Sequence, residues 1–191
     1  LGTTPLPQSL ELMVQNQRYQ WKLAENSTTQ RHTDRDWNLL CTDACTDRQV
    51  IYRALVALAR ELSSSARDQL IAEVVAWAGV SAAGRPENLA LSHNELRKLA
   101  QDGLIEIGAH TVSHPRLAAL TPYDQALEIQ NGKRQLEMWL ERPILSFAYP
   151  FGWFDDYTAE TRRLVRQAGF ACACSNFGGW ARWGIDPYQL P

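Results

Sequence analysis

From residue 92 onward, helical segments alternate with short apolar segments, and this alternation constrains the fold more than any other feature of the chain. The helix starts carry capping signals: Ser92 stands three residues before Glu95, and Thr121 precedes a proline. A third helix is expected from about Thr158. Apolar runs that predict buried strands follow the helices, at 104–108, 144–149 and 170–174. Helix–strand alternation favours right-handed crossovers, so we predict an α/β fold with a parallel sheet, either open or curled into a barrel.

The first half of the chain has a different pattern. Apolar residues alternate with others over 10–14 and 19–23, which is typical of a β-hairpin. Residues 25–47 are polar and rich in turn-forming residues, which predicts a long surface loop. Apolar residues recur at helical spacing over 51–62 and 70–77, which predicts two amphipathic helices in an α-hairpin.

Composition and charge exclude several classes of protein. With 191 residues, 45% of them hydrophobic and 21% charged, the chain is neither disordered nor a small disulfide scaffold. Nineteen basic and twenty-one acidic residues give a net charge of −2, which does not suit a nucleic-acid partner. The apolar stretch 70–80 contains Glu73 and is far shorter than the ~20 residues that span a bilayer, so we expect no membrane segment in this stretch.

Two segments rich in functional side chains follow expected strands. Residues 110–115 come directly after the first strand, and 147–153 close the second. Functional groups collect at the carboxyl ends of parallel strands. His110 and His114, two of only four histidines, are spaced so that their imidazoles can bind one divalent metal ion. The alternative is that both are loop histidines bonded to backbone carbonyls.

The cysteines carry a weaker signal. The pairs 41/45 and 172/174 could in principle form a four-thiolate zinc site, but neither has the usual spacing of two intervening residues. We expect Cys172 and Cys174 to be small buried residues on one face of a strand. His32, in the polar loop, and His93, beside a helix cap, are not expected to bind metal.

The segments GAHTVSHP, at 108–115, and FAYPFG, at 147–152, together resemble the polysaccharide deacetylase family, carbohydrate esterase family 4. The resemblance extends from about residue 91 to residue 191. It implies an incomplete or distorted (β/α) barrel with parallel strands, plus a helical insertion. On this hypothesis residues 1–191 form a single deacetylase-like domain that is truncated at both ends, and 25–90 are a loop and helical insertion.

The resemblance also implies an activity and a metal site. Family members hydrolyse N-acetyl groups on a sugar polymer, so the expected partner is an N-acetylated polysaccharide or oligosaccharide. His110 and His114 match two ligands of the family's divalent metal, for which zinc is the expected ion. Thr111 matches the Ser/Thr position that steadies this loop by hydrogen bonding.

The second segment is expected to complete the site. Phe151 matches the family's aromatic residue, whose backbone N–H contributes to the oxyanion hole. Tyr149 and Trp153, at the same strand end, are candidates for the walls of a sugar-binding site. Their alternative role is at the edge of the core.

The chain departs from the family pattern at several positions. Ala148 stands where many members have an arginine that orients the catalytic base. No strand ending in Asp-Asp precedes His110, and the only such pair, Asp155–Asp156, is expected to start the helix that follows it. A late Leu-x-His segment is also missing. We therefore expect the domain's first strand and its last to lie outside this sequence. The alternatives are an inactive glycan-binding homologue and a metal-dependent hydrolase of different chemistry on a related α/β barrel.

Overall fold

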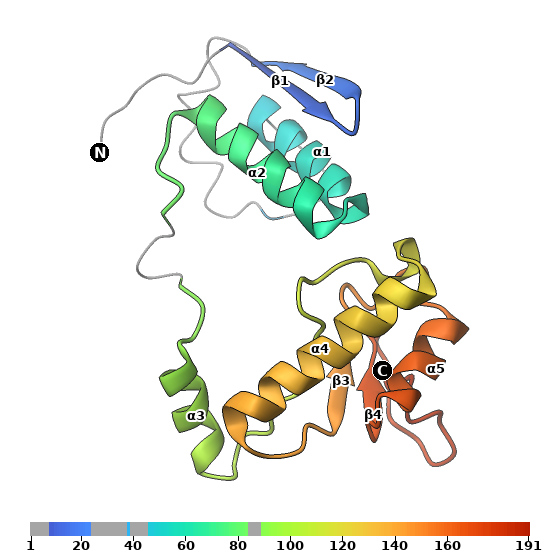
Figure 1. Ribbon diagram of the computed structural model, residues 1–191. Helices are drawn as coiled ribbons and strands as arrows, with labels where there is room; N and C mark the ends of the chain where they lie inside the picture. The colour runs from blue at the N-terminus through green and yellow to red at the C-terminus, as the bar shows by residue number, and fades with distance from the viewer. Residues whose placement is uncertain (1–7, 24–37, 39–45, 84–88) are drawn as a thin grey trace. The chain divides into compact units, whose positions relative to one another are not determined.

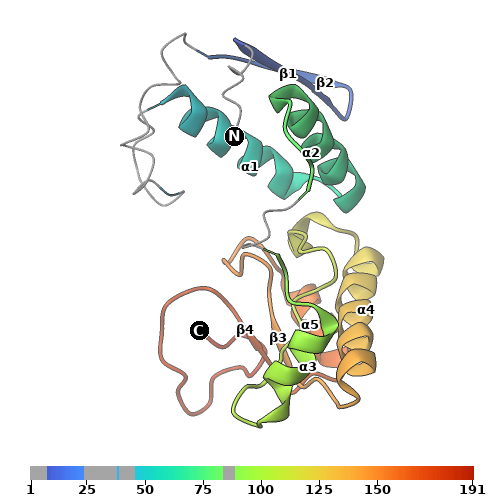
Figure 2. The same cartoon turned by 90° about the vertical axis from the view of Figure 1, so that its left-hand side faces the viewer.

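The computed structural model describes residues 8–23, 38, 46–83 and 89–191. The chain divides into two compact units, 1–84 and 85–191, and Figures 1 and 2 show the elements of each from two directions. None of the helices in the described ranges is both long enough and apolar enough to cross a membrane.

The first unit contains the predicted β-hairpin. Strands β1 (Ser9–Val14) and β2 (Gln17–Lys22) pair antiparallel, with Val14 opposite Gln17. The turn consists of Gln15 and Asn16, whose φ angles are 49° and 65°. Positive φ at both central residues is the geometry of a two-residue type I′ turn, whose twist matches that of paired strands.

Two helices complete this unit, as the apolar spacing predicts. Helix α1 (Asp47–Glu61) begins after Thr46, and α2 (Ser64–Ala78) begins after Ser63, each of which caps the helix with its side chain. Leucines of β1 form a buried cluster with residues of both helices: Leu10, Leu12, Ile51, Leu62 and Leu70. The predicted surface loop lies outside the described residues, except at 38, 46 and 47.

The second unit has the three expected helices and the second and third of the three expected strands. It comprises α3 (His93–Gln101), a short 3-10 helix (Leu117–Ala119), α4 (Pro122–Leu140), β3 (Ser146–Ala148), α5 (Ala159–Gln167) and β4 (Cys172–Cys174). Helices α3, α4 and α5 begin after Ser92, Thr121 and Thr158, whose side chains cap them. The predicted helix starts are therefore confirmed, and the unit is a mixed α/β structure.

The sheet of this unit is parallel but small. Strands β3 and β4 lie side by side in both views and pair from Ser146–Cys172 to Ala148–Cys174. Ala109 adds an isolated parallel bridge to Phe147. Phe147 is buried among side chains of α4, α5 and β4, including Ile129, Val165 and Ala173. This core fixes the carboxyl ends of the strands.

The strand predicted at 104–108 does not form. Only Ala109, just beyond it, pairs with β3, and Leu104 is 90% exposed. An apolar run becomes a buried strand only where another layer covers it, and within the described residues no strand pairs with 104–108 and no layer covers Leu104. The expectation for the cysteines also needs correction: Ala173 faces the core, Cys172 is half-buried and Cys174 is exposed.

Candidate functional site

His110 directly follows Ala109, the residue that bridges to β3, so the sheet edge fixes its position. Its Nδ1 lies 2.8 Å from the carbonyl oxygen of Ala148. A carbonyl only accepts hydrogen bonds, so Nδ1 carries the proton. In the neutral imidazole Nε2 then keeps its lone pair, which is the arrangement found in metal-binding histidines. Only backbone atoms of Ala148 take part, so its small side chain does not affect this contact.

His114 comes back to His110 because the loop between them turns sharply. Thr111 and His114 both have left-handed backbone conformations, with φ of 65° and 55°. The two imidazole centroids are 4.6 Å apart, with the rings inclined at 66°. The centroids of the His114 and Phe151 rings are 4.8 Å apart, and the two rings meet edge to face at 75°. The structure thus brings both predicted histidines and Phe151 together.

Thr111 joins the two histidines through its hydroxyl. Oγ1 accepts a hydrogen bond of 3.0 Å from the backbone N–H of His114 and donates one of 2.5 Å to the carbonyl of His110. The threonine side chain therefore closes the turn on which both imidazoles are carried.

Glu128, on α4, binds the same loop and was missed by the sequence analysis. Its Oε2 accepts hydrogen bonds of 2.9 Å from the backbone N–H groups of Val112 and Ser113. Its Oε1 accepts a further bond of 2.8 Å from the Ser113 hydroxyl. The carboxylate thereby binds two consecutive amide groups that lie outside any helix or strand.

Gly132 lies one helical turn after Glu128 and lets α4 approach the loop. A Cβ atom on Gly132 would lie 2.8 Å from the carbonyl oxygen of Thr111. Glycine in the interior of a helix is unfavourable, so its presence there often marks a close packing contact. That isolated glycine was the one sequence signal that could have pointed to this side of the loop.

The second loop begins where β3 ends. Phe151 has φ of 62° and Gly152 has φ of 73°, and the N–H of Gly152 donates to the Pro150 carbonyl at 2.7 Å. The Gly152 carbonyl accepts a 3.0 Å hydrogen bond from the N–H of Asn176, and a Cβ on Gly152 would lie 2.7 Å from that nitrogen. This tight turn fixes the backbone of Phe151, whose ring contacts that of His114.

Asp156 ties this turn to the histidine loop, contrary to the expectation that Asp155–Asp156 starts the next helix. The Asp156 side chain is fully buried, and its Oδ2 accepts a 3.0 Å hydrogen bond from the N–H of Trp153. Its Oδ1 lies 3.3 Å from Nε of Arg116, which follows the histidine loop. The Arg116 guanidinium also donates to the Asp155 carbonyl at 2.9 Å. Helix α5 begins only at Ala159.

Tyr149 and Trp153 have different environments. Tyr149 is 3% exposed, its ring stacks on Tyr157 at 3.9 Å, and its hydroxyl donates to the Tyr188 carbonyl at 2.8 Å. Burial raises the pKa of the Tyr149 hydroxyl well above its usual value. Tyr149 is therefore a core residue and not a wall of an open site, whereas Trp153 is 53% exposed and remains available to a ligand.

The donor atoms fit part of a metal site. Within the described ranges, no three His, Cys, Asp or Glu side chains gather as a metal-binding group. Two neighbouring imidazoles match two of the three protein ligands that a catalytic zinc ion usually has. Of the other histidines, His93 packs its ring on Trp139 at 4.1 Å, and His32 lies outside the described residues.

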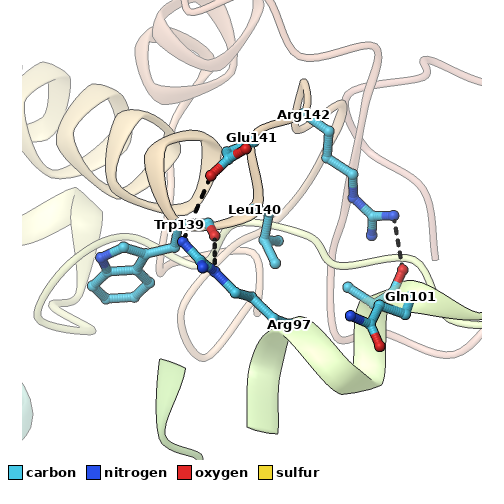
Figure 3. A pocket seen from close by; sticks show the side chains of 7 residues that line it. Arg97, Gln101, Trp139, Leu140, Glu141 and Arg142 are labelled. Atoms are coloured by element: carbon cyan, nitrogen blue, oxygen red, sulfur yellow. Dashed lines mark hydrogen bonds and ion pairs between the residues drawn. The ribbon is translucent and has the colours of Figure 1, made fainter. Parts of the chain in front are cut away.

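A pocket of about 220 Å³ between α3 and α4 is a separate feature (Figure 3). Arg97 donates from Nε to the Trp139 carbonyl at 2.8 Å, and Arg142 donates from Nη1 to the Ala100 carbonyl at 3.1 Å. Both guanidinium groups thus satisfy carbonyl groups near the ends of helices. We assign these contacts to the packing of α3 on α4, and none of the lining residues belongs to the histidine loop.

Comparison with known proteins places these features in a family. Residues 74–173, just over half of the chain, match the family model for polysaccharide deacetylases. Over 100 residues the chain is 29% identical to YxkH of Bacillus subtilis (strain 168), which is named provisionally as a polysaccharide deacetylase. This match covers 52% of the present chain and 34% of YxkH, so the chain spans about a third of the length of the curated relative that it matches.

Solved structures of deacetylases are similar to part of the chain. Streptococcus pyogenes deacetylase PplD in complex with acetate matches with a TM-score of 0.50 and 23% identity, over 55% of this chain and 45% of PplD. BC0361, a polysaccharide deacetylase from Bacillus cereus, has a TM-score of 0.47 and 21% identity, over 55% of this chain and 32% of its own. At this level of identity, the similarity to PplD is evidence for a shared fold only. On the match of the family model, the chain belongs to the polysaccharide deacetylase family.

Proposed function

We propose that the protein removes N-acetyl groups from a sugar polymer by metal-dependent hydrolysis, giving a free amine and acetate. One observation carries the proposal: the imidazoles of His110 and His114 lie 4.6 Å apart at a strand end, beside the turn that holds Phe151. Family membership supports the reaction class. Because the chain spans only part of its curated relative, the activity of the whole protein is a proposal.

His110 and His114 are the proposed metal ligands, with zinc as the proposed ion. The hydrogen bond from Nδ1 of His110 to the Ala148 carbonyl orients the ring and leaves Nε2 to bind. A bound divalent metal would lower the pKa of a water molecule toward ~7 and polarise the acetamide carbonyl. Thr111 holds the turn between the ligands through its hydrogen bonds to both histidines.

The backbone N–H of Phe151 is the proposed oxyanion-hole donor. The left-handed conformation at Phe151 and the tight turn at Gly152 fix this amide in place, and a preorganised donor of this kind lowers a barrier by about 3 kcal/mol. Trp153 is the proposed apolar wall for a sugar ring, since its side chain is half exposed on the same loop. Tyr149 is dropped from this role because it is buried.

Two parts of the reaction need further groups. Hydrolysis requires a base that takes the proton of the attacking water, and the metal requires a third protein ligand. We place both in the Asp pair of this family, outside the described residues. We also propose that β3 and β4 belong to a (β/α) barrel, and that residues 25–90 are an insertion in a single deacetylase-like domain.

A second candidate is an inactive homologue that binds glycan. Two observations favour it. No third His, Cys, Asp or Glu joins His110 and His114 among the described residues. Ala148 stands at the position of the family's arginine. A metal-dependent hydrolase of different chemistry is the remaining alternative. The three candidates predict different combinations of metal binding, oligomer binding and acetate release.

The test is release of acetate from N-acetylglucosamine oligomers by the full-length protein, with bound metal measured in the same samples. We expect acetate release, and we expect His110→Ala and His114→Ala to abolish both bound metal and acetate release. Normal metal occupancy in either variant would contradict the assignment of that ligand. Binding of the oligomers without acetate release would favour the inactive homologue. Metal binding without acetate release or oligomer binding would favour different hydrolytic chemistry.

A further inference from the structure

We propose that Glu128 is the positioning residue of the metal site: its carboxylate holds the loop from His110 to His114 in the conformation that brings the two imidazoles together. The inference rests on the proposed function, because it gives the loop geometry a role in metal binding. Glu128 touches neither imidazole in any of its hydrogen bonds, all of which go to Val112 and Ser113.

The loop needs an external support because its backbone is unfavourable by itself. Thr111 and His114 both have positive φ, a region that non-glycine residues, and β-branched residues above all, rarely adopt. Such conformations persist only where surrounding contacts over-determine them. Without those contacts, we expect the loop to relax and the imidazoles to separate.

Glu128 supplies these contacts between the two strained positions. Val112 and Ser113 are the residues between Thr111 and His114, and their N–H groups converge on one carboxylate oxygen at 2.9 Å each. Hydrogen bonds to an ionised acceptor are stronger than those between neutral groups. The bond from the Ser113 hydroxyl to the other oxygen fixes the orientation of the carboxylate.

Helix α4 makes the support rigid. Glu128 and Gly132 are four residues apart and so lie on the same face of the helix. Gly132 packs against the backbone of Thr111, and the neighbouring Ile129 is fully buried in the core. The loop is therefore attached to an element that cannot move without disturbing the core, which is what preorganised ligands require.

The experiment compares Zn²⁺ affinity and amide hydrogen exchange in the full-length protein, three Glu128 variants and one control variant. Glu128→Ala removes all three hydrogen bonds, and Glu128→Asp keeps the charge but shortens the side chain by one methylene. We expect Zn²⁺ affinity to fall about 10- to 100-fold in both, as it does when groups that orient ligands are lost. We expect exchange at Val112 and Ser113 to become faster, with exchange at Val165 in α5 unchanged.

Glu128→Gln is the conservative variant, because its carbonyl oxygen can still accept both N–H groups. We expect it to recover part of the affinity and of the amide protection. Gln135→Ala, an exposed position on the same helix, is the matched control and is expected to behave as wild type. A merely structural role for Glu128 would change exchange across α5 rather than at the loop.

The outcomes separate the inference from the proposed function. If the full-length wild-type protein binds no Zn²⁺, the proposed metal site is contradicted, and so is the role of Glu128. If wild type binds Zn²⁺ and Glu128→Ala binds it equally tightly, the inference alone is overturned. If Glu128→Ala does not fold, wild-type affinity in Glu128→Asp overturns it in the same way.

Discussion

Replacing Gly132 with alanine tests whether α4 packs against the histidine loop as closely as the structure indicates. The added Cβ would lie 2.8 Å from the Thr111 carbonyl oxygen and 2.9 Å from its carbonyl carbon. Non-bonded carbon atoms normally stay ~3.5–4.0 Å apart, and both contacts are with backbone, so the helix or the loop must shift. Overpacking of this kind costs about 1–3 kcal/mol. The higher helix propensity of alanine offsets about 1 kcal/mol of this loss of stability.

The net expectation for Gly132→Ala is a destabilisation of about 1 kcal/mol, with a further loss of Zn²⁺ affinity because Thr111 closes the histidine turn. Hydrogen exchange at Val165, buried in α5, reports the stability of this unit and is expected to become roughly 5-fold faster. Gly178→Ala is the matched control, since its Cβ would meet nothing within 4 Å. A Gly132→Ala variant that is more stable than wild type by about 1 kcal/mol, with unchanged Zn²⁺ affinity, would refute the close approach.

Three further predictions concern the supports of the fold. Asp156→Ala removes the buried partner of Arg116 and is expected to lower the free energy of unfolding, measured with denaturant, by about 2 kcal/mol; an unchanged midpoint would contradict a stabilising role for this ion pair. Iodoacetamide labelling followed by mass spectrometry is expected to modify Cys174 before Cys172, because Cys174 is exposed and burial raises the pKa of the Cys172 thiol; equal rates would contradict this order. Ser92→Ala removes the side-chain cap of α3 and is expected to cost about 1 kcal/mol of local stability, seen as faster exchange of the first-turn amides; unaltered exchange would argue against the cap.

The helices could be predicted from the sequence because the signals that start them are local. A capping side chain bonds to an amide only a few residues away, as Thr121 does to the N–H of Asp124 at 3.2 Å. The hairpin is likewise predicted from local alternation, although the register and the position of the turn at Gln15 and Asn16 come from the structure. A helix cap or a hairpin can be predicted because all the residues that form it are close together in the sequence.

The strand predicted at 104–108 shows where local signals end. Its apolar run, like that of 144–149, predicts a strand, yet only the later run is paired on one side by β4 and on the other by Ala109. Pairing and coverage depend on residues far away in the chain, and periodicity cannot distinguish an apolar run that has them from one that lacks them. The ion pair of the buried Asp156 with Arg116 also joins residues far apart in the chain, and neither residue indicates the other in the sequence.

The candidate site combines both kinds of information. The spacing of His110 and His114 allows two imidazoles to meet, but the same spacing also fits an open loop in which they point apart. The difference is made by left-handed backbone conformations at Thr111 and His114. Residues other than glycine rarely adopt this conformation, so the sequence does not predict it at these positions. Those conformations are imposed from α4, by the carboxylate of Glu128 and the missing side chain of Gly132. A motif of two histidines therefore does not by itself define a metal site, and in this chain the helix that follows it determines whether the two imidazoles converge.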